Sequence, residues 1–298
     1  MRLPGKAVPA VEINSLRYTM IEAPEARLLA SQLDETVRGK RIAEVVPLFS
    51  PHKFAWFDGD PERYAEFLLG KRIGNSRSLG GLVEVEADDR RLLFTDGVDL
   101  RFREAGASLP RKHQLLVGFE DQSCLTASVR MYGGLFCYAA GASPAGLYAP
   151  YYRSAKDKPQ VLSDDFDRDY FFSLIGSPLV QSRSAKAFLA TEQTIPGLGN
   201  GVLQDILFRS GIHPRTRIGS LTDDRRKRLY ESIRHTLREM LDAGGRDCET
   251  DLFGRKGGYV AALSKNTADR PCPCCGETVR RENYLGGSVY YCPSCQPL

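Results

Sequence analysis

Five of the eight cysteines lie close together near the end of the 298-residue chain, in the segments Cys272-Pro-Cys274-Cys275 and Cys292-Pro-Ser-Cys295. Two C-x-x-C pairs separated by 16 residues have the ligand spacing of a zinc ribbon, in which each pair supplies two thiolates to one tetrahedral metal. Cys272, Cys275, Cys292 and Cys295 fit as ligands, and Cys274 is left over. Two disulfides are the alternative, but they require an oxidising compartment. Because four protein ligands close the coordination shell, the pattern predicts one structural Zn2+ ion.

A second segment that could do chemistry is the turn Pro196-Gly197-Leu198-Gly199-Asn200, which has apolar residues at helical spacing on both sides. The two glycines allow the backbone to reverse sharply. Such a turn leaves unpaired backbone N–H groups at the start of the next helix, where the helix dipole favours a phosphate. The alternative is an ordinary helical hairpin without a ligand.

The elements that must position these residues differ between the two halves of the chain. Apolar residues recur at helical spacing over residues 25–37, which predicts a helix. Residues 40–140 form short alternating runs separated by turn signals, a pattern typical of a β-sandwich or barrel. The chain after residue 150 is expected to be helical, with a strongly amphipathic helix over residues 221–241.

These patterns predict an α+β protein: an N-terminal β-sandwich with a leading helix, a helical domain and a C-terminal zinc ribbon. We expect a leader extension at 1–19, a β-sandwich domain at 20–150, a helical domain at 151–262 and a zinc-finger domain at 263–298. The glycine-rich and charged stretch 246–270 is expected to be a mobile loop.

Composition narrows the possible functions. The chain is 42% hydrophobic and contains no apolar run long enough for a membrane span and no apolar signal core at its start, so we expect a cytoplasmic protein without membrane partners. The net charge is +4, and residues 183–298 carry 18 Lys+Arg against 13 Asp+Glu. A basic excess in this part is compatible with a nucleic-acid interface, and a solvated surface is the alternative.

The turn at 196–200, the exit Leu207-Phe-Arg-Ser-Gly-Ile-His-Pro214 and the four-cysteine ribbon together resemble the formamidopyrimidine-DNA glycosylase/endonuclease VIII family. The resemblance extends from about Met20 to the C-terminus, and the turn is similar to the family's helix–two-turn–helix motif. It implies a monomeric, bacterial and nucleoid-associated base-excision repair enzyme. Such an enzyme binds damaged double-stranded DNA, flips the damaged base, cleaves its N-glycosidic bond and then acts as an AP lyase.

The resemblance also implies roles for individual residues. Asn200 and Lys186 match an asparagine and a lysine that contact phosphates near the lesion. His113 and Arg130 match further phosphate and wedge positions in the N-terminal domain. Tyr132 matches an aromatic residue that enters the space left by the flipped base and offsets part of the unstacking energy. The alternative for Tyr132 is a place in the sandwich core.

Several positions depart from the family pattern. Ile21 stands where the family has its nucleophilic N-terminal proline, and a backbone amide has no lone pair with which to form a Schiff base. Gly81 replaces the lysine of the β-hairpin, Gly287 replaces the arginine of the zinc hairpin, and the wedge methionine is absent from residues 95–99. AP-lyase activity should therefore be weak. If an internal lysine does act, Lys53 among its aromatic neighbours is the first suspect.

One catalytic group of the family remains. Glu22 matches the glutamate that handles proton transfer at the anomeric carbon, and such a carboxylate can activate water. The alternative for Glu22 is a favourable charge at the start of the following helix. Two further alternatives for the whole protein are a non-catalytic damaged-DNA-binding protein and a zinc-ribbon protein that binds single-stranded RNA.

Overall fold

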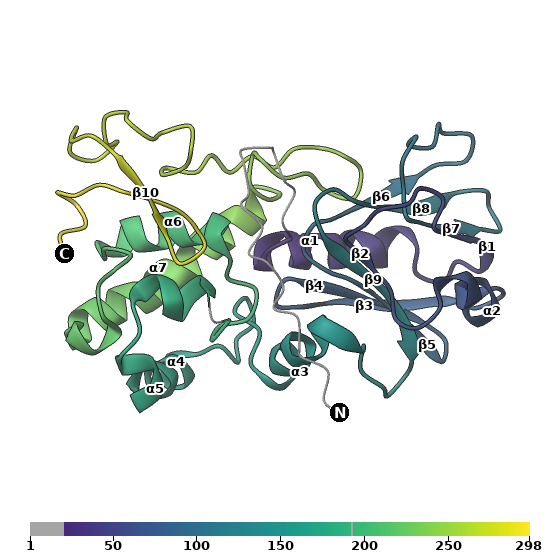
Figure 1. The fold of residues 1–298 in the computed structure, drawn as a ribbon, viewed down its shortest axis with the longest axis horizontal. Coiled ribbons are helices and arrows are strands. Elements are labelled where there is room, and N and C mark those ends of the chain that lie inside the picture. Colours follow the sequence, from purple (N-terminus) through teal and green to yellow (C-terminus); the bar gives the residue numbers. More distant parts are fainter. Residues whose placement is uncertain (1–20, 192) are drawn as a thin grey trace, which may run out of the picture.

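The computed structural model describes residues 21–191 and 193–298. A β-sandwich occupies one end of the molecule, and a group of helices with a β-hairpin above it occupies the other (Figure 1). This arrangement confirms the expected α+β architecture. The leader predicted at residues 1–19 lies outside the described residues, and the domain boundaries at 150 and 262 stay predictions.

The N-terminal region contains two facing sheets. One has the order β1-β7-β8-β6 and the other the order β2-β9-β5-β4-β3. All pairings are antiparallel except that of β2 with β9. The strands are β1 Ile42–Pro47, β2 Ala55–Trp56, β3 Ile73–Leu79, β4 Leu82–Ala87, β5 Arg90–Phe94, β6 Val98–Arg103, β7 Leu115–Phe119, β8 Cys124–Val129 and β9 Gly133–Ala139.

Helix α1, Ala23–Thr36, connects the sandwich with the helical region. Pro24 occupies its first turn, where a missing N–H has no intrahelical partner to lose. The apolar residues predicted to share one face, such as Leu29 and Leu33, are buried in the sandwich core. Because α1 also contacts α7, it fixes how the two halves of the molecule meet.

The second half is helical and has its own apolar core. Helix α7 begins after the cap residue Thr222 and buries the apolar side of the predicted amphipathic helix. The helices are α2 Tyr64–Leu68, α3 Ala149–Asp157, α4 Arg168–Gly176, α5 Pro178–Gln181, α6 Asn200–Ser210 and α7 Asp223–Asp242, with shorter turns η1 Pro61–Arg63, η2 Gly146–Tyr148, η3 Ala187–Thr191 and η4 Ile218–Ser220.

The stretch after α7 has no strand or long helix, yet it is anchored. Leu252 is fully buried in the core of the β-sandwich, although it follows the helical region in sequence. Its N–H donates to Oε1 of Gln32 at 3.0 Å, and its carbonyl accepts from the N–H of Phe102 at 2.9 Å. The chain then enters the hairpin of β10, Arg280–Tyr284, and β11, Gly287–Tyr291. The expected loop is therefore held against the sandwich at Leu252.

Candidate functional site

A cleft of about 990 Å³ lies where the sandwich, the turn before α6 and the loop after α7 meet. Its lining includes Ile21 and Glu22 from the start of α1, Asn200 from α6 and Arg130 from the sandwich. Three residues predicted from the sequence, Glu22, Asn200 and Arg130, are therefore brought to one cleft.

Glu22 lies at the N-terminus of helix α6. One carboxylate oxygen accepts from the N–H of Gly201 and the other from the N–H of Val202, both at 2.8 Å. These N–H groups have no intrahelical partner, so the carboxylate caps α6 from a distant part of the chain. Burial raises the pKa of Glu22, while Arg246 and the two N–H groups oppose this shift. The side chain of Glu22 lines the cleft.

Arg246 neutralises the buried acids at the start of α1. Its guanidinium donates to both carboxylate oxygens of Glu25 at 2.9 Å and lies 3.5 Å from the carboxylate of Glu22. The charges of Glu22, Glu25 and Glu249 raise the pKa of Arg246 well above its usual value, against the effect of burial. The cation therefore persists, and it ties the loop after α7 to the start of α1.

Two of the positions that depart from the family, Ile21 and Gly81, lie side by side. A Cβ placed on Gly81 would lie 2.8 Å from the carbonyl oxygen of Ile21 and 3.6 Å from the hydroxyl of Tyr151. Gly197 adopts φ +88°, and a Cβ there would meet the backbone of Gly80 at 2.7 Å. The β3–β4 turn and the turn before α6 therefore pack backbone to backbone, with no room for a side chain at position 81.

Asn200 and Lys186 contact the β10–β11 hairpin. The amide of Asn200 donates to the carbonyl of Ser288 at 2.8 Å. The ammonium of Lys186 donates to the carbonyl of Tyr284, and to that of Gly287 at 3.2 Å. Burial lowers the pKa of Lys186 to about 8. A Cβ on Gly287 would lie 3.3 Å from Nζ of Lys186, so a side chain there would emerge beside both residues.

The other predicted contacts lie in the sandwich. Arg130 is 53% exposed and forms an ion pair with Asp99. His113 is buried, and its ring stacks on Phe49 with centroids 4.3 Å apart. Arg130 thus offers a charge at the cleft, whereas His113 lies among the side chains at the edge of the sandwich.

Tyr132 is partly exposed. Its ring centroid lies 6.0 Å from that of Trp56, and its hydroxyl is hydrogen-bonded to Asp96. Asp96 also accepts from the hydroxyl of Tyr148 at 2.9 Å and lines the cleft. Tyr132 is therefore tied to the cleft wall through Asp96.

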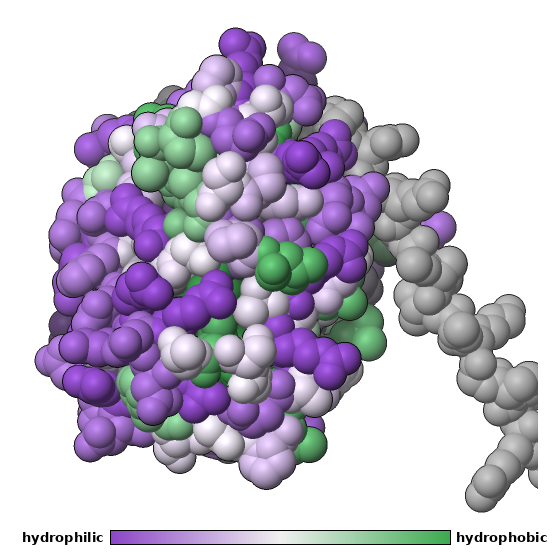
Figure 2. Space-filling view, turned by 90° about the vertical axis from the view of Figure 1, so that its left-hand side faces the viewer, coloured by the Kyte–Doolittle hydropathy of each residue, from purple (hydrophilic) through white to green (hydrophobic). Residues whose placement is uncertain are grey.

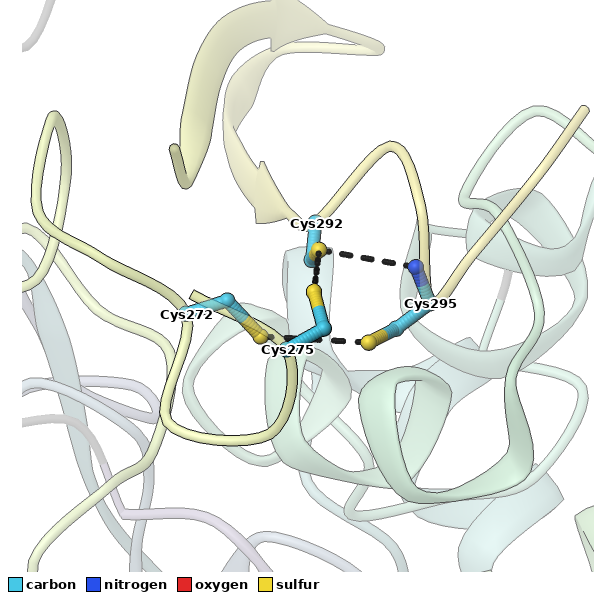
Figure 3. Close-up of side chains that lie close together, drawn as sticks. All are labelled: Cys272, Cys275, Cys292 and Cys295. Atoms are coloured by element: carbon cyan, nitrogen blue, oxygen red, sulfur yellow. Dashed lines mark hydrogen bonds between the residues drawn. The ribbon is translucent and has the colours of Figure 1, made fainter. Parts of the chain in front are cut away.

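The four predicted ligand cysteines come together. Figure 3 shows their sulfur atoms pointing toward one another from the two loops, and all four Sγ atoms lie within 4.8 Å. The Sγ atoms of Cys272 and Cys295 are 3.8 Å apart, and those of Cys275 and Cys292 are 3.4 Å apart. Tetrahedral zinc with Zn–S bonds of ~2.3 Å separates its sulfurs by about 3.8 Å, so this cluster can hold a metal ion. Cys274 lies outside it.

Sequence reasoning missed Arg246, Tyr151 and Asp96. Arg246 stands after two glycines without a motif, and its role depends on acids more than 200 positions away. Tyr151 belongs to α3, a short helix whose apolar spacing gave no functional signal. Lys53, suspected as an internal nucleophile, carries its ammonium 5.4 Å from the centre of the Phe54 ring and is not among the described residues that line the cleft.

The outer face of the helical region is mostly hydrophilic, with separate hydrophobic patches (Figure 2). Among the described residues, no helix is both long and apolar enough to cross a membrane.

Residues 158–251 match the family described as "Formamidopyrimidine-DNA glycosylase H2TH domain". The formamidopyrimidine-DNA glycosylase of Shouchella clausii is 27% identical over 290 residues, covering 93% of this chain and 99% of that protein. The MutM (Fpg) structure from Thermus thermophilus has a TM-score of 0.75 at 25% identity, covering 92% of this chain and 98% of that one. The Lactococcus lactis Fpg complex with DNA containing an abasic site has a TM-score of 0.78 at 23% identity, covering 93% of this chain and all of that one.

The fold and the cleft define a two-part protein in which a helix–two-turn–helix segment and a four-cysteine ribbon face a β-sandwich. The matches above place residues 158–251 in the H2TH-domain family, and the chain resembles formamidopyrimidine-DNA glycosylases along 93% of its length.

Proposed function

We propose that this chain is a base-excision repair enzyme that binds damaged double-stranded DNA in the cleft, flips the damaged base and cleaves its N-glycosidic bond. The observation that carries the proposal is the position of Glu22. In a chain that resembles formamidopyrimidine-DNA glycosylases, its carboxylate is fixed at the N-terminus of α6 and lines the same cleft as Asn200.

DNA affinity arises from phosphates at the cleft edge. Asn200 is exposed at the start of α6, beside the N–H groups that Glu22 caps, and its side-chain amide can donate to a phosphate oxygen. Lys186 lies behind it and supplies positive charge, while Arg130 supplies charge from the opposite wall. His113 and Tyr132 complete the proposed contacts, with Tyr132 entering the space left by the flipped base. These contacts are to the DNA backbone and to the stacked faces of the bases, so they confer little sequence preference.

The metal of the ribbon is one structural zinc ion, held by Cys272, Cys275, Cys292 and Cys295. The donor set of four thiolates suits zinc, and four protein ligands leave no open position for catalysis. Its role is to fold the hairpin whose carbonyls contact Lys186 and Asn200.

The chemistry that the residues support is hydrolysis. Glu22 can accept a proton from water, and burial, which raises its pKa, makes it a better base than an exposed carboxylate. AP-lyase activity by imine formation is weak, because Ile21 replaces proline and Gly81 replaces lysine.

A non-catalytic damaged-DNA-binding protein is the second candidate, because the same replacements of proline and lysine remove both family amines. The test is release of free base from lesion duplexes by the purified chain. The Lactococcus lactis Fpg has been solved with DNA containing an oxidized pyrimidine, and a mutant of it with DNA containing Fapy-dG, which gives the first two lesions to try. Release by the wild type that is lost in Glu22→Gln supports the enzyme. Binding without release from any lesion supports the second candidate.

We propose that the protein is a monomer located in the bacterial cytoplasm near the nucleoid. Its proposed domains are residues 20–150, 151–262 and 263–298. A zinc-ribbon RNA-binding protein would instead prefer single-stranded RNA, so competition between RNA and lesion duplex separates the two.

A further inference from the structure

The hydroxyl of Tyr151 lies between two of the segments that form the cleft, the β3–β4 turn and the turn before α6. Tyr151 belongs to helix α3, and its side chain lines the cleft together with Ile21 and Glu22. The N–H of Gly81 donates to the hydroxyl oxygen at 3.0 Å, and the N–H of Gly197 donates to it as well. One donor belongs to the β3–β4 turn and the other to the turn before α6, so the oxygen position is fixed from both sides.

These two contacts determine what the hydroxyl can still do. A phenol has one O–H donor in addition to its acceptor capacity. Both backbone groups are donors, so they occupy the oxygen as acceptor and leave its proton free. Among the described residues, no acceptor for this proton is found, and Tyr151 lines the cleft, where a substrate would lie.

We propose that Tyr151 is a catalytic residue whose hydroxyl donates a hydrogen bond, and then a proton, to the departing damaged base. The inference rests on the proposed glycosylase function and deepens it. It also gives a reason for Gly81: a side chain there would collide with Ile21 and lie against the hydroxyl of Tyr151.

The proton balance of the step is simple. Water attacks the anomeric carbon while the bond from that carbon to the base nitrogen breaks, and the electron pair leaves with the base. Tyr151 gives its proton to the base, and Glu22 takes a proton from the water. Return of that proton to Tyr151 after product release restores both groups. One water is consumed, and a free base and an abasic sugar are formed.

The protonation state of Tyr151 suits this role. Burial, together with the charges of Asp96 and Glu22, raises its pKa to about 12, and the two backbone N–H groups oppose this shift. The phenol therefore keeps its proton at neutral pH and can act as a donor. Glu22, as the base, and Tyr151, as the acid, line the same cleft.

Tyr151→Phe tests the proposal, with Tyr152→Phe as the matched control. The hydroxyl of Tyr152 donates to Glu84 within the sandwich, so its loss removes a comparable hydrogen bond away from the cleft. The first measurement is the single-turnover rate of base release from a Fapy-dG duplex. The second is the preference for the lesion, which is the affinity for the same duplex made uncleavable by a 2′-fluoro group divided by the affinity for undamaged duplex. For Tyr151→Phe we expect a fall of about 100-fold in rate, the scale of general acid catalysis. We expect about 5-fold lower preference for the lesion, the scale of one hydrogen bond.

If Tyr151→Phe has a rate of base release and a preference for the lesion that both stay within about 3-fold of wild type, the proposal is overturned, because the loss of one hydrogen bond would then have almost no effect. If the wild type binds the lesion but releases no base, the proposed function fails, and the lesion preference alone then decides whether Tyr151 contacts the base. If Tyr151→Phe does not fold, a fluorinated tyrosine at 151 keeps the acceptor and makes the phenol more acidic. A donor role predicts that its alkaline loss of rate moves to lower pH, whereas an unchanged pH profile contradicts that role.

Discussion

Gly81 lies against Ile21 so closely that a Cβ on the glycine would stand 2.8 Å from the isoleucine carbonyl oxygen. These are the two positions at which the family has its amines. The replacements are therefore structurally linked, since the turn that carries Gly81 uses the space a lysine stem would need.

Gly81→Lys should not restore a working amine. The new side chain would force the β3–β4 turn away from Ile21 and Tyr151, and overpacking of this kind costs about 1–3 kcal/mol of unfolding free energy. Urea unfolding measures the loss, and borohydride trapping on an abasic duplex measures any new imine.

Gly176→Lys is the control for this substitution. Gly176 ends helix α4, and a Cβ added there would meet no described atom within 4 Å, so the same change should leave stability unaltered. A Gly81→Lys protein as stable as wild type, with strong trapping, would show that the turn accepts the lysine and that our account of this junction is wrong.

Glu22→Gln should destabilise the protein as well as slow base release. The amide replaces one acceptor oxygen by a donor that faces the N–H of Gly201 or Val202, and it leaves Arg246 with less negative charge. Breaking a buried charge pair in this way costs about 3–5 kcal/mol. Thermal unfolding measures the effect, and activity is compared at a temperature where both proteins are folded.

Glu35→Gln, an exposed change on the same helix, is the control and should alter neither property. If Glu22→Gln has normal stability but releases no base, Glu22 acts in the reaction and does not stabilise the fold. Lower stability with full base release would limit it to capping α6.

Much of this site could be predicted from the sequence, for reasons that are local. The spacing of Cys272, Cys275, Cys292 and Cys295 depends only on the geometry of two C-x-x-C turns, and the structure brings their sulfurs together. The leading helix followed from the spacing of Leu29 and Leu33. In each case the residues that carry the signal lie near one another in the sequence.

The missed features depend on contacts between distant segments. Arg246 joins the loop after α7 to Glu25 at the start of α1, and no periodicity marks an arginine with that role. Leu252 looks like a loop residue, yet it completes the core of the sandwich. Tyr151 becomes conspicuous only when Gly81 and Gly197 are seen to donate to it.

Lys186→Met should change how stability depends on pH. Burial lowers the pKa of Lys186 to about 8 in the folded chain, whereas an unfolded lysine titrates near ~10.4. Between these values the unfolded state binds more protons, so the free energy of unfolding rises with pH as the cost of the buried ammonium disappears. The variant should lose this rise, which urea unfolding between about pH 7.5 and 10.5 would detect.

Lys227→Met, an exposed change on α7, should keep the rise. The same pair of variants tests DNA binding. Losing one phosphate contact at Lys186 should reduce the slope of log affinity against log salt by about 0.9. An unchanged pH profile together with an unchanged salt slope would mean that Lys186 serves only to hold the β10–β11 hairpin.

Cys292→Ser should remove the metal and weaken DNA binding together. The ribbon is too short to bury enough apolar surface alone, so loss of a ligand should unfold it. Unfolding would release the carbonyls that position Asn200 and Lys186. Elemental analysis should find about one zinc per wild-type chain, a value expected for a four-thiolate site.

Cys274→Ser is the matched control, because Cys274 lies outside the cluster and should leave zinc and affinity intact. Full zinc content in Cys292→Ser, or none in the wild type, would contradict the proposed ligand set.

We expect this chain to release a damaged base by hydrolysis without an efficient amine nucleophile. The most direct measurement follows free base and borohydride-trapped protein in the same reaction, on one lesion duplex, beside a proline-initiated relative. We predict base release by both proteins but trapping of this chain far below that of the relative. Efficient trapping that survives a blocked N-terminal amine would contradict the account. It would point to an internal lysine, with Lys256 and Lys265, which line the cleft, ahead of Lys53.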